Sequence, residues 1–328
     1  MNNCVEFSLR DTVKFFKKNK NFIILTHASP DGDTLGAGYA LYHGLKQLGK
    51  NATVICPDVI PQKYSYFLCD TDHLKRENSL VVAVDVADKC LLGSLQDEFG
   101  DEVDLNIDHH ISNARYAKAL YLDSDASATC EMIYELLSKL KVKFNDTISK
   151  AIYTGIATDT GCFKYSSVTA KTHKIAADLY NYNIEAHNIN KIMFDTKSKN
   201  LLTLERMVLD TAEYHFDDKC MVLTITADMQ QKTNCSGPDL EGVTLISRSV
   251  EGVKAGVTIK QTGSDTYKIS LRTYEPLNAA EICKAIGGGG HKNAAAATAC
   301  GSLSDVKSRV LDAIKKQMEE KNAWTSAT

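Results

Sequence analysis

The first residues that could do chemistry are one histidine and two aspartates within seven positions, His27, Asp31 and Asp33. They follow the apolar run Phe22–Leu25, which predicts a buried strand, and they precede a helical pattern. In open α/β sheets, ligand sites form at the carboxyl ends of the strands, where this turn would lie. Imidazole and carboxylate groups together suit divalent metals such as Mn²⁺, Fe²⁺ and Zn²⁺. An Asp-Gly turn that caps the next helix is the structural alternative.

Two further carboxylates follow apolar segments. Asp85 comes directly after Leu80–Val84, the strongest strand prediction in the chain. An ionised carboxylate there is costly unless it is exposed or paired, so the alternatives are a solvated loop and a bound cation. Asp159 ends an apolar helical pattern. Because the C-terminus of a helix disfavours an anion, Asp159 favours a nearby cation, which a metal would supply.

Two adjacent histidines, His109 and His110, follow Asp108 and the short strand predicted at Leu105–Ile107. Neighbouring side chains diverge, so one histidine can bind a metal while the other faces a substrate. A polar surface loop is the alternative for this triplet.

The elements that must position these residues alternate between strand and helix in the first two thirds of the chain. Continuous apolar strands between helices predict a parallel sheet covered on both faces, hence an α/β fold. A smaller α/β part follows a helical stretch, so we predict a first domain at 1–186, a helical linker at 187–212 and a second domain at 213–328. Predicted strands lie at Phe22–Leu25, Thr53–Cys56, Leu80–Val84, Leu105–Ile107, Val222–Thr226, Ala255–Lys260 and Tyr267–Arg272. Predicted helices include Ala126–Leu140, Ile148–Ile156, Asn278–Ile286 and Leu303–Met318, the last with Ser302 and Asp305 as a capping box.

The second part carries a possible phosphate site. Arg272 ends a strand and could fork onto phosphate oxygens. Gly287–Gly290, followed by His291 and Lys292, would leave backbone N–H groups open to cradle an anion, although a flexible loop is the alternative. Residues 248–292 contain seven Lys/Arg and four Asp/Glu, a local +3 that leaves −6 for the rest of the chain.

The bulk composition limits the class of protein. The chain has 328 residues with a net charge of −3, which argues against a binder of long nucleic acids but not against short phosphorylated substrates. None of the ten cysteines forms a C-x-x-C pair, and no apolar stretch suits a signal peptide or a membrane span. We therefore expect a reducing, cytoplasmic protein without membrane segments.

Taken in order, these motifs are similar to the four motifs of the DHH phosphoesterases, and the later segments resemble the associated DHHA1 domain. The segment from Asp239 to Val253 further resembles the bacterial nanoRNase branch, the NrnA-type oligoribonuclease and pAp phosphatase. The resemblance implies a DHH catalytic domain, a helical linker and a substrate-binding DHHA1 domain. The residues that carry the DHH resemblance are His27, Asp31, Asp33, Asp85, Asp108, His109, His110 and Asp159.

The same resemblance implies two Mn²⁺ ions, with Mg²⁺ or Co²⁺ as alternatives. One ion would be held by His27, Asp31 and Asp85. The other would be held by Asp33, Asp85, His109 and Asp159, with Asp85 bridging. Asp108 would orient a ligand and His110 would face the scissile phosphate. The substrate phosphate would be held by Arg272, Gly288, Gly289, Gly290, His291 and Arg248. The family usually has glycine where Ala296 stands, and a positive φ there would strain the alanine.

The implied activity is metal-dependent hydrolysis of di- to pentanucleotides to mononucleotides, with pAp as a further substrate. Hydrolysis of pApA or cyclic di-AMP is an alternative within the same chemistry, and a non-catalytic nucleotide-binding regulator is an alternative of another class. The run from Gly287 to His291 disfavours an inorganic pyrophosphatase, whose second domain lacks it. We expect no long duplex nucleic acid as partner, a preference for short substrates and, from similar proteins, a homodimer.

Overall fold

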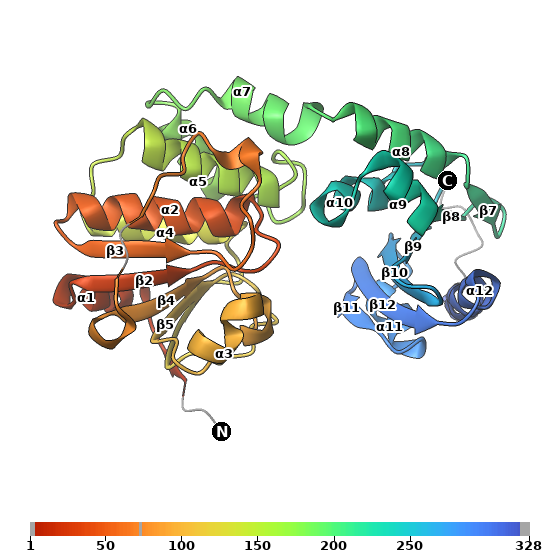
Figure 1. Ribbon diagram of the computed structural model, residues 1–328, viewed down its shortest axis with the longest axis horizontal. Coiled ribbons are helices and arrows are strands. Elements are labelled where there is room, and N and C mark those ends of the chain that lie inside the picture. Colours follow the sequence, from red (N-terminus) through yellow and green to blue (C-terminus); the bar gives the residue numbers. More distant parts are fainter. Residues whose placement is uncertain (1–3, 72–73, 322–328) are drawn as a thin grey trace. The chain divides into compact units, whose positions relative to one another are not determined.

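The computed structural model describes residues 4–71 and 74–321. Its chain divides into two compact units, and the boundary along the chain lies between Thr196 and Lys197 (Figure 1). This boundary falls within the 187–212 segment for which a helical linker was predicted. That segment contains α7 (Ala186–Asn190), the π-helical turn η4 (Lys191–Asp195) and α8 (Lys199–Leu209). The exact domain limits stay a prediction. No helix in the described residues is both long and apolar enough to cross a bilayer.

A six-stranded, wholly parallel sheet forms the frame of the first unit, in the order β1-β6-β5-β4-β2-β3. This confirms the predicted α/β class with a parallel N-terminal sheet. Its strands are β1 (Val5–Glu6), β2 (Asn21–Leu25), β3 (Asn51–Ile55), β4 (Leu80–Val84), β5 (Leu105–Asp108) and β6 (Ala119–Leu122). Its helices are α1 (Leu9–Lys18), α2 (Gly32–Gln47), α3 (Gln96–Phe99), α4 (Thr129–Lys139), α5 (Asp146–Asp159) and α6 (Ala170–Leu179). Shorter turns are η1 (Gln62–Tyr64), η2 (Arg76–Asn78) and η3 (Lys89–Leu95).

Both faces of this sheet are buried, which explains the continuous apolar strands. Ile24 and Val82 join the larger core beneath α1, α2, α4 and α5, whereas Ile23 and Val81 join a smaller core beneath η3 and α3. In Figure 1, α2 and α4 lie on one side of the sheet and α3 on the other.

Two glycines let the helices that carry site residues approach closely. A Cβ at Gly36 of α2 would collide with the carbonyl oxygen of Ala151 in α5. A Cβ at Gly155 of α5 would collide with the Cys130 sulfur and would lie 2.8 Å from Asp33 Oδ1. The absence of side chains at both positions brings the start of α2 against the end of α5.

The second unit is built on a six-stranded mixed sheet, in the order β11-β12-β10-β9-β8-β7. Its strands are β7 (Glu213–His215), β8 (Cys220–Ile225), β9 (Ala255–Gln261), β10 (Thr266–Thr273), β11 (Gly289–His291) and β12 (Ala294–Cys300). Besides α8, its helices and turns are α9 (Ala227–Thr233), η5 (Gly237–Leu240), α10 (Glu241–Thr244), η6 (Ile246–Arg248), α11 (Ala279–Ala285) and α12 (Leu303–Glu320). The predicted strands and helices of this part agree with β8, β9, β10, α11 and α12 to within two residues at each end.

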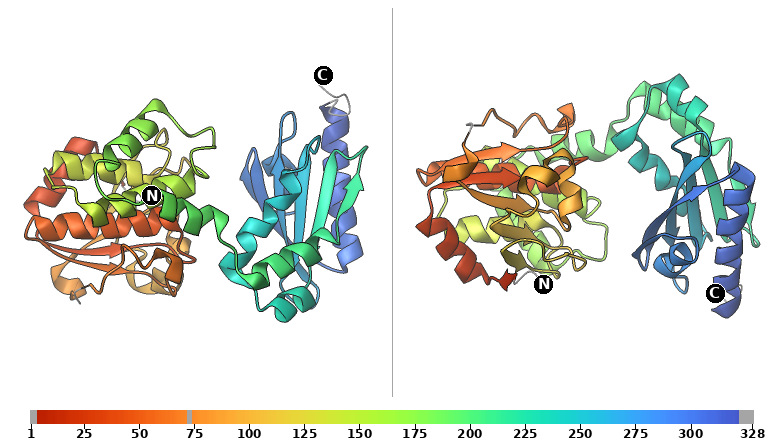
Figure 2. Two further views of the ribbon diagram at one scale, coloured as in Figure 1. Left: turned by 90° about the horizontal axis from the view of Figure 1, so that it is seen from above. Right: turned by 60° about the horizontal axis from the view of Figure 1, so that its bottom comes forward.

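Helices cover the two faces of this sheet unequally. One face packs on α11 and α12, and Figure 2 shows α12 running along the strands. The other face is covered over β8 by α8, α9 and α10. Over β10 and β12 it stays partly open, because Lys268 and Thr298 are exposed while Ser270 and Arg272 are half-buried.

The capping box predicted for α12 is only half present. The Ser302 hydroxyl accepts a hydrogen bond from the Asp305 backbone N–H at 3.2 Å, as expected. The Asp305 carboxylate accepts from the Ser302 hydroxyl at 2.7 Å, and no bond back to the N-cap backbone N–H is formed.

Candidate metal centre and anion-binding face

The carboxyl edge of the first sheet brings together side chains from separate segments. Their possible ligand atoms form three groups, and the atoms of each group all lie within 4.8 Å of one another. The groups are His27, Asp31 and Asp85; Asp33, His109 and Asp159; and Asp85, His109 and His110. All six residues that were predicted to bind metal are in these groups, together with His110. Asp85 belongs to two of the groups and lies 3.7 Å from both His27 Nε2 and His109 Nε2.

Hydrogen bonds fix which nitrogen of each histidine faces the carboxylates. The Nδ1 atoms of His27 and His109 lie 2.8 and 3.2 Å from the carbonyl oxygens of Ala28 and Ala126. A carbonyl only accepts, so each Nδ1 donates, and in the neutral ring it is Nε2 that carries the lone pair and faces the carboxylates. Histidines that bind metals are held in this way.

His109 Nε2 supplies the strongest test of whether a cation fits. It is buried and makes no hydrogen bond with any described residue, although Asp159 Oδ2 lies 3.4 Å away. Buried polar atoms are nearly always satisfied, so an orphaned nitrogen aimed into a carboxylate cluster needs an explanation. A divalent cation, for which imidazole and carboxylate are suitable ligands, supplies one.

The raised pKa values of the crowded carboxyl groups also indicate a site for a cation. Burial, together with the charge of Asp33, raises the pKa of Asp85 to about 8. Burial and the charge of Asp159 raise the pKa of Asp33 to about 6. Burial raises the pKa of Asp159 to about 7, with Asp85 adding to the shift against the opposing effect of His109. Without a cation these groups resist ionisation, and a cation would relieve both the repulsion and the missing solvation.

Asp33 has a second, structural role that its position in the sequence did not reveal. Its two carboxylate oxygens accept the backbone N–H groups of Thr129 and Cys130 at 2.6 and 2.9 Å. These are the first residues of α4, whose N-cap residue, Ala128, has no side-chain cap. Asp33 therefore caps α4 from another helix and fixes the position of its own carboxylate.

The backbone at Asp85 is held in an uncommon conformation. Its φ of 60° is in the left-handed region, which a residue other than glycine adopts at an energetic cost. The Thr129 hydroxyl donates to Asp85 Oδ1 at 2.9 Å and orients the carboxylate. Sequence reasoning missed Thr129, because no local pattern connects it with Asp85.

Asp108 lies behind the cluster and is fully buried. Its Oδ1 accepts from His110 Nδ1 at 2.8 Å, and its Oδ2 accepts from the Asn113 amide at 2.6 Å. His110 thus presents Nε2 outward, and the Asp108 hydrogen bond raises its pKa to about 9 despite the opposing effect of burial. Asn113, which also bonds Asn106, was missed; its place five residues after Asp108 is the only signal for it.

In the second unit, strand register places the predicted phosphate-binding residues in one row. Arg272 is paired with Gly256 of β9 and Ala294 of β12, and Ala294 is paired with His291 of β11. Directly paired residues project on the same face, so Arg272 and His291 share the face that helices leave partly open. A Cβ at Gly256 would collide with the backbone of Ser247 and Arg248, which places that backbone on this face too.

The glycine run is not the loop that was predicted. Gly289–His291 forms the edge strand β11, and Gly288 directly precedes it. A Cβ at Gly290 would lie 2.5 Å from Ala295 Cα, so glycine is required for close pairing with β12. An edge strand still presents unpaired backbone N–H groups on its outer side. Ala296 lies within β12, outside the positive-φ residues, so the suspected strain is absent.

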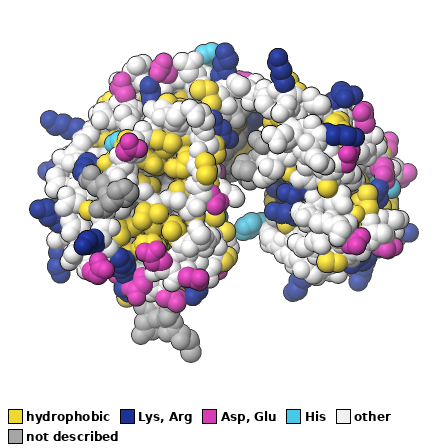
Figure 3. All heavy atoms as spheres, viewed as in Figure 1, with side chains coloured by type: hydrophobic (Ala, Val, Ile, Leu, Met, Phe, Trp, Pro, Cys, Tyr) yellow, Lys and Arg dark blue, Asp and Glu magenta, His cyan; other side chains and the backbone are white. Residues whose placement is uncertain are grey.

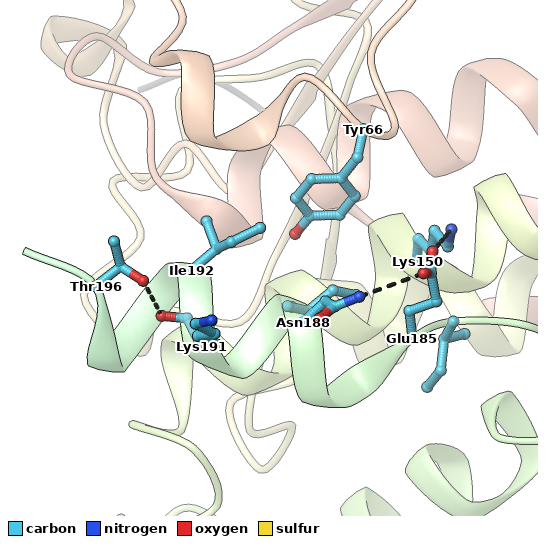
Figure 4. Close-up of a pocket in the computed structure, with 9 residues that line it drawn as sticks. Tyr66, Lys150, Glu185, Asn188, Lys191, Ile192 and Thr196 are labelled. Atoms are coloured by element: carbon cyan, nitrogen blue, oxygen red, sulfur yellow. Dashed lines mark hydrogen bonds and ion pairs between the residues drawn. The ribbon is translucent and has the colours of Figure 1, made fainter.

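The other surface features lie apart from these two sites. A cavity of about 340 Å³ is lined by Tyr66, Lys150, Ile184, Glu185, Asn188, Ile189, Lys191, Ile192 and Thr196, with no residue of the metal-ligand groups (Figure 4). The face of the first unit seen in Figure 3 mixes acidic and basic side chains around a hydrophobic area. That face carries no continuous basic surface of the kind that binds long nucleic acids.

Comparison with known proteins gives matches for both units. The DHH family N-terminal domain matches residues 21–156, and the DHHA1 domain matches residues 217–320. The chain is 31% identical over 304 residues to the bifunctional oligoribonuclease and PAP phosphatase NrnA of Thermus thermophilus, covering 90% of this chain and 89% of the relative. Identity to the protein of the same name from Bacillus subtilis is 26% over 281 residues, covering 84% of this chain and 88% of the relative.

A solved structure shares the fold. The exopolyphosphatase-related protein from Bacteroides fragilis matches with a TM-score of 0.83 at 22% identity, covering 96% of this chain and 97% of that chain.

Proposed function

Because the chain belongs to the DHH family and carries a DHHA1 domain, we propose that it is a metal-dependent phosphoesterase. Its substrates are di- to pentanucleotides, which it hydrolyses to mononucleotides, and pAp is a further substrate. The observation that carries this proposal is the orphaned nitrogen of His109, buried among carboxylates whose pKa values are raised. The names of the curated relatives, oligoribonuclease and PAP phosphatase, support the choice of substrate.

The proposed cofactor is a pair of Mn²⁺ ions, for which Mg²⁺ or Co²⁺ can substitute. His27, Asp31 and Asp85 would hold one ion. Asp33, Asp85, His109 and Asp159 would hold the other, so Asp85 would be a ligand of both. Ions bound there would lower the pKa of a coordinated water and neutralise charge on the phosphoryl group.

His110 is the proposed proton donor. Its Nδ1 is bonded to Asp108, which leaves Nε2 available to the oxygen that departs from phosphorus. In the metal-free fold the Asp108 hydrogen bond raises the pKa of His110 to about 9 against the opposing effect of burial, and this raised pKa favours the protonated ring that a proton donor needs. Asp108 is a positioning residue, because it contacts the ring of His110 and is itself fully buried.

The substrate-binding role belongs to the open face of the second unit. Arg272 offers a planar fork for two phosphate oxygens, and Ala294, its neighbour in the row on the β12 side, has only a methyl side chain. His291 and Arg248 add positive or hydrogen-bonding groups beside it. Gly289 and Gly290 lie in the edge strand, which can offer an outward N–H group, whereas the Gly288 N–H already donates to the Cys283 carbonyl oxygen at 2.8 Å. The same face would accept pApA or cyclic di-AMP, so a substrate panel must include both.

The test is a Mn²⁺-dependent assay with purified full-length protein on bis-p-nitrophenyl phosphate, dinucleotides, pAp, pApA and cyclic di-AMP. We expect turnover of dinucleotides that disappears with EDTA and falls at least a hundredfold in His109→Ala and Asp85→Ala. Full activity in either variant would end the proposal. Nucleotide binding without hydrolysis of any substrate would favour the alternative of a non-catalytic regulator. Light scattering of the same sample tests the proposed homodimer, and the cytoplasmic location stays a prediction.

A further inference from the structure

A strained turn follows Asp159, the last residue of α5. Gly161, Cys162 and Phe163 have φ values of 56°, 61° and 63°, three successive residues in the left-handed region. Non-glycine residues adopt this region at a cost, so the turn must be held by its surroundings. The buried Thr160 holds it: its hydroxyl accepts the Phe163 N–H at 3.0 Å, and its carbonyl accepts the Tyr165 N–H at 3.1 Å.

The turn packs an aromatic ring against Gly161, close in the chain to Asp159 of the metal centre. A Cβ at Gly161 would lie 2.5 to 2.9 Å from three ring carbons of Tyr165, so the ring rests directly on this glycine. Gly161 is two residues from Asp159, whose carboxylate lies 3.4 Å from His109 Nε2. Tyr165 is 39% exposed, so part of its side chain is accessible to a ligand.

Tyr165 is one of four large hydrophobic residues exposed in the segments around the cluster. Val59, Leu91 and Ile111 are the others, 93%, 41% and 77% exposed. The first two are tied to the loop of His27, since Ser29 N–H donates to Asp58 at 2.7 Å and Ala28 N–H donates to the Leu91 carbonyl at 2.7 Å. Ile111 directly follows His110. A polar cluster with an apolar rim matches a phosphate that is flanked by flat nucleobases.

We propose that the ring of Tyr165, the only aromatic member of this rim, stacks on the nucleobase next to the scissile phosphate. The inference rests on the proposed function and adds a substrate-positioning contact in the catalytic unit. Stacking on an aromatic face tolerates every base, because each base has a π-face. The contact therefore selects nucleotides over base-free phosphodiesters without selecting a base sequence. Gly161 leaves the space in which the ring lies flat.

The test compares full-length, Mn²⁺-loaded Tyr165→Ala, Tyr165→Leu and Tyr165→Phe with the wild type. Tyr165→Leu keeps Gly161 covered but lacks a π-face, so it serves if Tyr165→Ala fails to fold. Tyr214→Ala is the matched control, because Tyr214 is 47% exposed on β7, at the opposite edge of the second sheet from β11. Each variant is assayed on a dinucleotide and on two analogues that each lack one base.

We expect Tyr165→Ala and Tyr165→Leu to raise KM for the dinucleotide about tenfold with kcat little changed, while Tyr165→Phe and Tyr214→Ala behave as the wild type. The defect should vanish on one of the two analogues and persist on the other, which identifies the stacked base. An unchanged KM in Tyr165→Leu, or an equal loss on all three substrates, would overturn the inference.

Failure of the proposed function gives a different result. In that case the wild type turns over none of the three substrates, and the contact is measured by equilibrium binding of the labelled dinucleotide. A tenfold weaker affinity in Tyr165→Leu than in Tyr165→Phe then supports stacking, and equal affinities refute it.

Discussion

The carboxyl groups of Asp33, Asp85 and Asp159 make the stability of the metal-free protein depend on pH. Their pKa values in the fold, about 6, 8 and 7, lie above the ordinary value of 3.8. The folded chain therefore binds these protons more tightly than the unfolded chain. The resulting stability is fully present below pH 4 and is lost as the pH rises through the three raised values.

This linkage predicts opposite slopes with and without metal. In EDTA, the unfolding temperature should fall between pH 5 and pH 8. With Mn²⁺ it should rise over the same range, because the ligands must be deprotonated to bind. Calorimetry at several pH values measures both slopes, and Asp85→Asn should flatten the slope in EDTA. Equal slopes in the two series would contradict a cation-binding cluster.

Asp108→Asn tests the positioning of His110. The amide keeps the shape of the carboxylate but removes the charge that favours a protonated ring, so the pKa of His110 should fall from about 9. We expect roughly 10- to 100-fold lower kcat, as for other groups that orient site histidines, and an alkaline limb of the pH profile that moves to lower pH. Asp101→Asn is the control, because Asp101 is 81% exposed and pairs with Lys89 on the surface. Loss of activity with an unmoved limb would argue for a merely structural role.

Most residues of the candidate centre could be predicted from the sequence because each ends a strand or helix, or directly follows one. Asp85 after Leu80–Val84 is the clearest case, since the parallel sheet brings such ends to one edge. Thr129 could not be predicted, because its bond to Asp85 joins residues 44 positions apart. The capping of α4 by Asp33 was hidden for the same reason, since it depends on helix packing through Gly36 and Gly155.

At the scale of elements, the close approach of α2 and α5 is predicted to depend on Gly155. Gly155→Ala inserts a methyl group against Cys130 and Asp33, so it should lower the free energy of unfolding by about 1–3 kcal/mol and weaken Mn²⁺ binding. Gly242→Ala is the matched control, because a Cβ there meets nothing within 4 Å. Denaturant unfolding and Mn²⁺ titration of both variants check the prediction. Equal effects of the two substitutions would contradict the account of α2–α5 packing.

Arg272 lies in the row of paired residues that crosses β9, β10, β12 and β11. Its position predicts an effect on substrate binding that is separate from the metal centre. Arg272→Ala should raise KM for a 5′-phosphorylated dinucleotide roughly 10- to 100-fold, which corresponds to about 1.5–3 kcal/mol for a hydrogen bond to a charged group. Hydrolysis of bis-p-nitrophenyl phosphate, which carries no second phosphate, should change little. Arg206→Ala is the control, since Arg206 is 72% exposed on α8. An equal loss on both substrates would show that Arg272 acts on folding or on the metal centre instead.

The strands that the sequence did not reveal have physical reasons for being hidden. β12 is a run of alanines with no period-two pattern of large side chains, and β11 consists of two glycines and a histidine. β12 is set by pairing with β10, and β11 is set by close backbone pairing with β12, not by their own propensity. β1 and β6 are short: β6 forms by pairing with β5, and β1 then adds to β6 as the edge strand of the parallel sheet.

At the scale of the whole molecule, the two units have separate cores and separate proposed tasks. The first unit contains the candidate metal centre, and the second contains the residues that are proposed to bind substrate phosphate. If each of these two sites binds one phosphate of the substrate, nucleotides beyond those two phosphates add no contact. We therefore expect kcat/KM at least tenfold higher for a dinucleotide than for a 24-mer of the same base composition. Equal kcat/KM values for both lengths would contradict these separate roles of the two units.

The most direct test is the number of Mn²⁺ ions that the full-length chain binds at equilibrium, measured by dialysis followed by elemental analysis. The account predicts two ions per chain for the wild type and fewer for His109→Ala and Asp85→Ala, with the Gly242→Ala control unchanged. A wild-type chain that binds no Mn²⁺, or whose bound Mn²⁺ is unaffected by removing His109 and Asp85, would contradict it.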